Sequence, residues 1–251
     1  MANLYEYFKL ANPIKDWDGL PFPYSKTHRN IGISQWWGTN GQWYRDNGID
    51  ILGHNGIDIG YPFRTEVVFP IKLWVTFVQN IDEPGYGKYL FGQTEEQFID
   101  GQGYHLELCF GHFDDIVATP NRWHEAGELI GYGDSTGFST GNHLHMGIRP
   151  YKRINQSSHQ QLELNNGYYG YVDPEPYLPK LRWTIGELEN LDMTNAKLTK
   201  DKASSMVGFF LPAKDEASLV SMAENLGYDL PVKDGKPDWE NINFDRFLDI
   251  K

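Results

Sequence analysis

The sequence predicts a mostly β fold, with an antiparallel β-sheet or β-sandwich-like core and a small helical appendage at the C-terminal end. Three observations support this prediction. Aromatic residues make up 15% of the 251 residues, beside 26 Gly and 14 Pro, a mixture typical of short strands joined by many turns. Between residues 51 and 180, β-branched and aromatic runs alternate with turn signals. After Pro179, apolar residues recur at helical spacing instead.

The elements follow in order along the chain. Residues 1 to about 50 are rich in aromatic residues and turns. The expected strands lie at 67–69, 73–78, 104–110 and 143–148, with a turn at 84–87. Residues 92–103 read as an enlarged hairpin that either lines a groove or only lengthens a loop.

The C-terminal part has a different pattern. Helices are expected at 217–226 and 241–248, separated by a linker at 233–237. We therefore expect one domain over residues 1–180 and a small helical appendage of unknown role over 181–251.

Charge and composition exclude several classes of protein. The chain has 22 Lys and Arg against 34 Asp and Glu, a net charge of -12, and no basic run, so binding to nucleic acid or to an anionic membrane surface is not expected. No apolar run approaches the ~18 residues of a membrane span. Residues 1–10 lack the features of a secretory signal. Nothing in the sequence indicates an oligomeric state.

Two apolar features have ordinary explanations. The single cysteine, Cys109, lies in the apolar run 106–110 and is expected to be a buried packing residue, because it has no partner for an internal disulfide. Trp36, Trp37 and Trp74 are expected in the core rather than on a sugar-stacking surface.

Histidines carry the chemistry that the sequence suggests. His143 and His145 are two residues apart in an expected strand, which places both on one face, ~6.6 Å apart, with Leu144 and Met146 on the other. One of the pair could bind a metal while the other meets a substrate. Such a spacing also arises by chance, so the pair alone is a weak signal.

A third histidine and a carboxylate complete a possible metal site. A straight strand would hold His54 and Asp58 ~13 Å apart, but Gly56 between them permits a bend that brings both to one point. Two histidines and one aspartate leave a position open for water, the layout of a catalytic zinc site. Nitrogen ligands favour Zn²⁺ over Ca²⁺ or Mg²⁺. His112 and the remaining member of the His143/His145 pair are then available for proton transfer.

The order of these motifs resembles that of the LytM/lysostaphin-type zinc endopeptidases, which hydrolyse peptide bonds of bacterial peptidoglycan. The family pattern begins with H-x-x-x-D and ends with G-x-T-G-x-S-T-G-x-H-L-H. Residues 54–58 read HNGID, and residues 133–145 read GDSTGFSTGNHLH. Residues 127–131, GELIG, are similar to the family's G-x-x-I-G, and the similarity extends over about residues 33–178.

The resemblance implies a role for each motif residue. His54, Asp58 and His145 correspond to the ligands of one zinc ion, and His112 and His143 to the catalytic pair. A tyrosine that some relatives place shortly before the first ligand has no counterpart, because Gly48 occupies that position. Tyr44 is the nearest candidate for an oxyanion donor, with an ordinary packed aromatic residue as the alternative.

The resemblance predicts a zinc-dependent peptidoglycan endopeptidase acting on the bacterial cell wall. A non-catalytic wall-binding or structural module on the same fold, and a zinc carboxypeptidase that trims stem peptides, are the alternatives. Without a secretory signal, delivery in a virion or by lysis is expected, as for a phage-associated lysin, although a chain shortened at its N-terminus would read the same way. The sequence does not indicate which bond or wall chemotype is cleaved.

Overall fold

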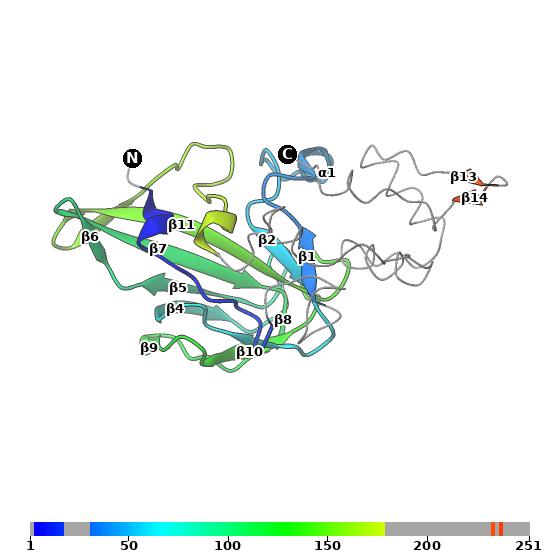
Figure 1. Ribbon diagram of the computed structural model, residues 1–251, viewed down its shortest axis with the longest axis horizontal. Helices are drawn as coiled ribbons and strands as arrows, with labels where there is room; N and C mark the ends of the chain where they lie inside the picture. Colours follow the sequence, from blue (N-terminus) through cyan, green and yellow to red (C-terminus); the bar gives the residue numbers. More distant parts are fainter. Residues whose placement is uncertain (1–2, 18–30, 179–231, 234–235, 238–251) are drawn as a thin grey trace, which may run out of the picture.

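The computed structural model describes residues 3–17, 31–178, 232–233 and 236–237. Within these residues, two antiparallel sheets form the body of the fold, as the strand-rich sequence predicts (Figure 1). The larger sheet has nine strands in the described part of the chain and runs in the order β1-β2-β11-β7-β5-β4-β9, with β12 paired to β11 and β6 to β7. The smaller sheet has the order β3-β10-β8.

The strands of the larger sheet have these bounds: β1 Gly32–Gln35, β2 Ile57–Gly60, β4 Leu73–Gln79, β5 Tyr89–Thr94, β6 Gln97–Ile99, β7 Gln102–Gly111, β9 Arg122–His124, β11 His143–Asn155 and β12 Ser158–Gln161. Those of the smaller sheet are β3 Glu66–Val68, β8 Phe113–Ile116 and β10 Leu129–Gly133. Helical segments are short: η1 Leu4–Glu6, α1 Gly41–Asp46 and η2 Glu175–Tyr177.

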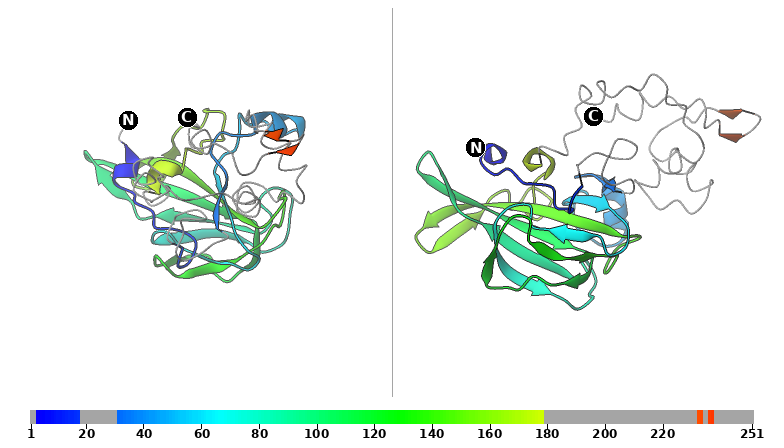
Figure 2. Two further views of the ribbon diagram at one scale, coloured as in Figure 1. Left: turned by 45° about the vertical axis from the view of Figure 1, so that its right-hand side comes forward. Right: turned by 60° about the horizontal axis from the view of Figure 1, so that its bottom comes forward.

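The core lies between the two sheets. The longest strands, β11 and β7, run side by side through the middle of the larger sheet (Figures 1 and 2). Their inward side chains, including Leu108, Phe110, Leu144 and Met146, are fully buried. The smaller sheet contributes buried Val67, Phe113, Ile116 and Ile130. The alternation of buried and outward residues along β11 leaves the opposite face of the larger sheet available for polar groups.

The N-terminal segment is part of this body. Its backbone pairs with β3 at a bridge between Ile14 and Val67, and the Leu10 N–H donates to the Tyr177 carbonyl of η2 over 2.9 Å. Leu4, Phe8, Leu10, Ile14 and Trp17 are buried in the core. The described part of the segment therefore packs with the sheets.

Residues 92–103 lengthen the larger sheet. β6 pairs back onto β7 through a two-residue turn, in which Asp100 and Gly101 have φ values of 51° and 80°. Side chains from this segment do not line the main cavity described below. The structure therefore favours the interpretation in which this enlarged hairpin only lengthens the connection and does not line a groove.

The tryptophans only partly follow the prediction. Trp36 packs against the core, but Trp74 lies on the outer face of β4 beside half-exposed Trp123, 5.7 Å between ring centroids. The prediction for Trp74 is wrong because it occupies the outward position between buried Leu73 and Val75. Cys109 is 1% exposed, as predicted, and burial raises the pKa of its thiol to about 12.

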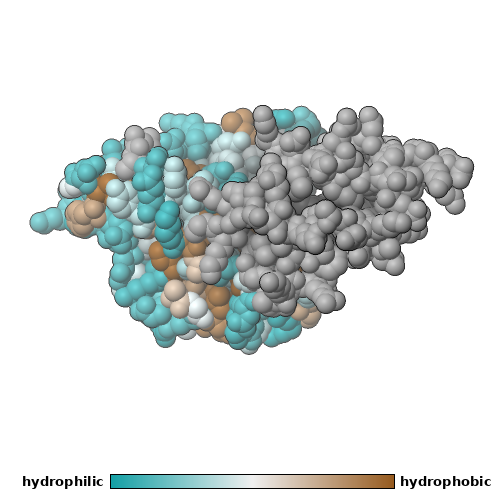
Figure 3. All heavy atoms as spheres, in the orientation of Figure 1, coloured by the Kyte–Doolittle hydropathy of each residue, from teal (hydrophilic) through white to brown (hydrophobic). Residues whose placement is uncertain are grey.

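The helical appendage falls almost entirely outside the described residues, including both of its expected helices. The expected linker at 233–237 belongs to a strand pair instead, in which β13 Val232–Lys233 pairs with β14 Lys236–Pro237. None of the helices in the described part of the chain has the length and hydropathy of a membrane-spanning segment. The described surface seen in Figure 3 is mostly hydrophilic, with apolar residues in small groups.

Candidate metal centre

Two neighbouring strands bring the acidic residue and one histidine together. In the pairing of β2 with β11, Asp58 lies directly opposite His145. Leu144 and Met146, which flank His145, point into the core and are fully buried. The alternation therefore places Asp58, His143 and His145 on the outer face of the larger sheet, as the spacing of the histidines predicts.

His54 reaches the same point from the segment that precedes β2. The chain bends at Asn55 and Gly56, as expected, although Gly56 does not have a positive φ. The sequence did not reveal a second reason for glycine at this position. A Cβ atom at Gly56 would lie 2.6 Å from His145 Cε1 and 2.6 Å from the Met146 carbonyl oxygen. Glycine allows the chain that carries His54 to lie directly against the His145 ring.

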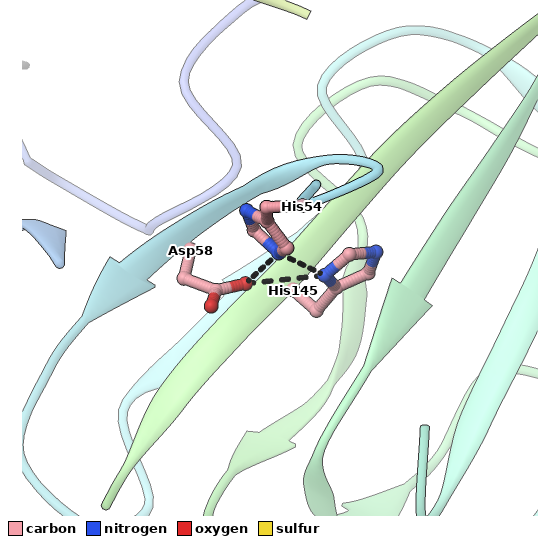
Figure 4. A group of neighbouring side chains, drawn as sticks. All are labelled: His54, Asp58 and His145. Atoms are coloured by element: carbon pink, nitrogen blue, oxygen red, sulfur yellow. Dashed lines mark hydrogen bonds and ion pairs between the residues drawn. The ribbon is translucent and has the colours of Figure 1, made fainter. Parts of the chain in front are cut away.

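The three side chains point toward one another (Figure 4). The distance between His54 Nε2 and His145 Nδ1 is 3.0 Å, and each of these atoms lies 3.1 Å from Asp58 Oδ1. Ligands about 2.0–2.1 Å from a tetrahedral ion lie about 3.3 Å from one another. The triangle thus has the size and the donor set, two imidazole nitrogens and one carboxylate oxygen, that suit zinc.

Hydrogen bonds and charge prepare the three groups for a cation. His54 Nδ1 donates to the Trp36 carbonyl over 3.3 Å, so Nε2 is the nitrogen that faces the triangle. Burial disfavours ionisation of Asp58, but charge on His54 and His143 and hydrogen bonds from His145 and His54 outweigh it, so the pKa of Asp58 is well below its usual value. Burial lowers the pKa of His145, which favours its neutral form.

His112 lies at the end of β7, where the chain turns into β8. Its φ of 68° is unusual for a residue other than glycine. His112 Nδ1 donates to the Thr136 carbonyl over 2.6 Å, which leaves Nε2 without the proton in the neutral ring. Burial, with repulsion from His143 and His145, lowers the pKa of His112 to about 3. A neutral imidazole with an available lone pair therefore faces the other histidines.

His143 lies beside His112, with 4.5 Å between the ring centroids. Its Nδ1 donates to the Gly141 carbonyl over 2.8 Å, and its Nε2 lies 3.5 Å from Asp58 Oδ2. The backbone of Asp134 joins both residues: its N–H donates to the His112 carbonyl, and its carbonyl accepts from the His143 N–H. The structure thus brings all five predicted site residues together.

These residues line an open cavity of about 1120 Å³. α1 and the segment that follows it form one wall, and residues 138–142 form another. Trp43, Phe138 and Tyr169 line the cavity with 49%, 60% and 52% of their surface exposed. Partly exposed aromatic side chains therefore form part of the cavity wall.

Tyr44 also lines the cavity, with its ring parallel to that of His54 and the centroids 6.3 Å apart. Its hydroxyl accepts a hydrogen bond from Gln35 Nε2 over 3.4 Å. Burial, with the charge of Asp58, raises the pKa of Tyr44, which keeps the hydroxyl protonated. Gly48, by contrast, follows α1 and does not line the cavity.

Sequence reasoning missed two residues of the site. Tyr86 lines the cavity and lies against His145, with 4.9 Å between the ring centroids. Asn55 donates from Nδ2 to the Tyr86 hydroxyl over 2.9 Å. The turn at 84–87 was predicted, but no pattern in it indicates that its tyrosine reaches the histidines.

Comparison with known proteins gives one family match. The profile of peptidase family M23 matches residues 52–159. No curated protein matches the chain.

Several solved structures are similar to this one. The catalytic domain of the antimicrobial peptidase lysostaphin from Staphylococcus simulans is 18% identical, with a TM-score of 0.38, covering 71% of this chain and 98% of that domain. A variant catalytic domain of the prophage-encoded M23 protein EnpA from Enterococcus faecalis is 21% identical, with a TM-score of 0.41 and coverage of 59% and 92%. A zinc-containing peptidase from Vibrio cholerae is 16% identical, with a TM-score of 0.39 and coverage of 70% and 40%.

Proposed function

Because residues 52–159 of the chain belong to peptidase family M23, we propose that the protein is a zinc-dependent endopeptidase that hydrolyses peptide crosslinks or bridges of bacterial peptidoglycan. The observation that carries the proposal is the triangle of His54 Nε2, Asp58 Oδ1 and His145 Nδ1 at an open cavity, with two further imidazoles beside it.

His54, Asp58 and His145 would hold the zinc ion. When bound, zinc polarises the scissile carbonyl and lowers the pKa of a coordinated water to about 7. Three protein ligands of this kind leave a position for that water. The two buried imidazoles and the ionised Asp58 are already oriented for a cation, so little rearrangement is needed on binding.

His112 is assigned as the group that accepts a proton. Its Nδ1 proton is held by the Thr136 carbonyl, so the lone pair of Nε2 is the free acceptor. The low pKa keeps the ring neutral at neutral pH, so the lone pair of Nε2 is available to a water molecule. The hydroxyl of Thr136 donates to the Phe113 carbonyl over 2.9 Å, which fixes the segment that orients His112.

His143 is assigned as the group that delivers a proton to the leaving amine. Its Nδ1 proton is held by the Gly141 carbonyl, and its Nε2 lies 3.5 Å from Asp58 Oδ2. Tyr44 is assigned as a hydrogen-bond donor to the carbonyl oxygen as it becomes negative, because its hydroxyl stays protonated and its side chain lines the cavity.

The proposed place of action is the bacterial cell wall. Association with a phage, by virion or by lysis, stays a prediction. The full chain, including residues 181–251, should be used in every test because the role of that part is not assigned.

The test is digestion of purified cell walls of several chemotypes, with new amino groups measured over time and fragments identified by mass spectrometry. We expect amino groups to appear, activity to be lost on chelation, and activity to return with zinc. His145→Ala should lower the rate by roughly 10³-fold or more, as expected for loss of a metal ligand. His159→Ala, a histidine outside the cavity, is the matched control and should retain the rate.

Other outcomes would overturn the proposal. Full activity of His145→Ala would remove the zinc mechanism. Wall binding without new amino groups would identify a non-catalytic module. Release of terminal residues alone, with crosslinks intact, would identify a carboxypeptidase.

A further inference from the structure

The outer nitrogen of His145 lacks the support that a metal-binding histidine usually has. Such a histidine normally donates its second N–H to a carboxylate, a carbonyl or water, and this bond fixes the ring. His145 Nε2 is buried and has no hydrogen-bond partner among the described residues. On this side of the ring only packing can fix its orientation, whereas Nδ1 on the other side contacts Asp58 and His54.

Two groups lie against the His145 ring. The backbone at Gly56 is so close that a Cβ there would be 2.8 Å from His145 Nε2. The Tyr86 ring lies 4.9 Å away between centroids and is inclined by 32°. Removal of the Tyr86 ring would leave His145 free to rotate away from Asp58.

Tyr86 also contacts the segments that carry two other site residues. Its hydroxyl accepts from Asn55, the neighbour of His54, over 2.9 Å. Its carbonyl accepts from the backbone N–H of His112 over 2.9 Å. One residue thus touches the segments of His54, His112 and His145, which come from three separate parts of the chain.

The close approach of Tyr86 is built into the fold. Position 111, opposite His145 on β7, is a glycine, and a Cβ there would lie 3.2 Å from Tyr86 Cβ and 3.3 Å from its carbonyl oxygen. The turn that carries Tyr86 has glycines on both sides with φ values of 92° and 63°. These glycines let the turn lie flat over the end of β7.

We propose that Tyr86 is a positioning residue of the metal centre, whose ring fixes His145 and whose hydroxyl fixes the His54 segment through Asn55. The packing of the Tyr86 ring fixes His145 in place of the hydrogen bond that His145 Nε2 lacks. The inference rests on the proposed function, since it concerns the same zinc site.

The experiment measures zinc affinity by competition with a chelating dye, which does not depend on turnover, beside kcat and KM on cell-wall peptides. Tyr86→Phe keeps the ring and removes the hydrogen bonds of the hydroxyl to Asn55 and Tyr171, and we expect zinc affinity to fall about two- to tenfold. Tyr86→Leu removes the ring, and we expect a fall of roughly 10- to 100-fold with a lower kcat. KM should change little in Tyr86→Phe.

Tyr89→Phe is the matched control, because Tyr89 lies next to the Tyr86 ring, 5.8 Å between centroids, but does not line the cavity. It should leave zinc affinity and kcat unchanged. If circular dichroism shows that Tyr86→Leu does not fold, the zinc affinity and kcat of Tyr86→Phe decide the test.

Wild-type zinc affinity and kcat in a folded Tyr86→Phe and Tyr86→Leu would overturn the inference and leave the proposed function standing. A wild-type protein that binds no zinc would overturn the proposed function itself. The two failures are therefore distinguishable.

Discussion

His54 Nε2 lies 3.0 Å from His145 Nδ1, although 91 positions separate the two residues along the chain. Two imidazole nitrogens at this distance need a proton or a cation between them, since two lone pairs repel. Asp58 Oδ1, 3.1 Å from both, adds negative charge at the same point. The arrangement is complementary to a divalent cation, and it depends on how closely the Gly56 segment approaches β11.

Gly56→Ala should damage the metal centre. The added Cβ would meet His145 Cε1 and the Met146 carbonyl at 2.6 Å, so the segment must move away from β11. We expect zinc affinity to fall at least tenfold, and the free energy of unfolding to fall by about 1–3 kcal/mol. Chelator competition and denaturant unfolding measure the two effects.

The control for Gly56→Ala is Gly127→Ala. A Cβ at Gly127 meets nothing within 4 Å, but the φ of 84° strains any side chain there. It should lower stability by about 1 kcal/mol and leave zinc affinity unchanged. Equal zinc affinity in both variants would show that the approach of Gly56 to His145 does not matter.

Tyr44→Phe tests the assigned oxyanion donor. The variant keeps the ring beside His54 and removes only the hydroxyl, so we expect kcat to fall roughly 100-fold. Zinc affinity should stay at the wild-type value because Tyr44 is not among the clustered ligand residues. Steady-state kinetics on a defined wall peptide provide the measurement, and an unchanged kcat would make Tyr44 an ordinary packed aromatic residue.

Trp43→Ala tests whether the cavity wall contacts the substrate. Trp43 lines the cavity and is 49% exposed, so its loss should change stability by less than about 0.5 kcal/mol. We expect KM to rise about three- to tenfold with kcat unchanged, since Trp43 is not among the clustered ligand residues. Phe77→Ala, 43% exposed and outside the cavity, should leave KM unaltered. A similar KM for the wild type, Trp43→Ala and Phe77→Ala would argue against binding of the substrate at α1.

His105 should make stability depend on pH. Burial, followed by repulsion from His159 and opposed by attraction to Glu96, lowers the pKa of His105 from 6.5 to about 4. Between these values the unfolded chain binds the proton more readily than the folded one. The contribution of neutral His105 to the free energy of unfolding is therefore complete above about pH 6.5 and is lost as pH falls toward 4.

The comparison is His105→Phe, which keeps a ring stacked on Tyr151. Between pH 7 and pH 4.5, the wild type should lose about 1–2 kcal/mol more unfolding free energy than the variant, allowing for partial solvent screening. Urea unfolding at each pH gives these values. Parallel pH curves for the two proteins would contradict the low pKa.

Much of the fold could be predicted from local patterns. The alternation of His143, Leu144, His145 and Met146 correctly predicts which residues face the core, because strand geometry fixes the side of each residue. The β-branched run at 73–78 correctly predicts β4. Trp74 shows the limit of such reasoning, since its size suggests the core while its position in the strand places it outside.

The support of the site could not be predicted in the same way. Tyr86 and Asn55 are 31 positions apart, and nothing in either segment indicates that they share a hydrogen bond. The bend at Gly56 was expected, but the room that this glycine leaves for a ring arriving from β11 was not. Contacts of this kind depend on tertiary packing, whereas the ligand spacing depends on the strand itself.

The turn at Asp100 and Gly101 offers a practical site for attachment. It joins β6 to β7 at the far end of a strand whose other end reaches Gly111, beside the histidines. Its backbone conformation suits small insertions, which exposed two-residue turns tolerate well. A fluorophore, affinity handle or surface tether placed there would leave the mouth of the cavity free to meet an insoluble polymer.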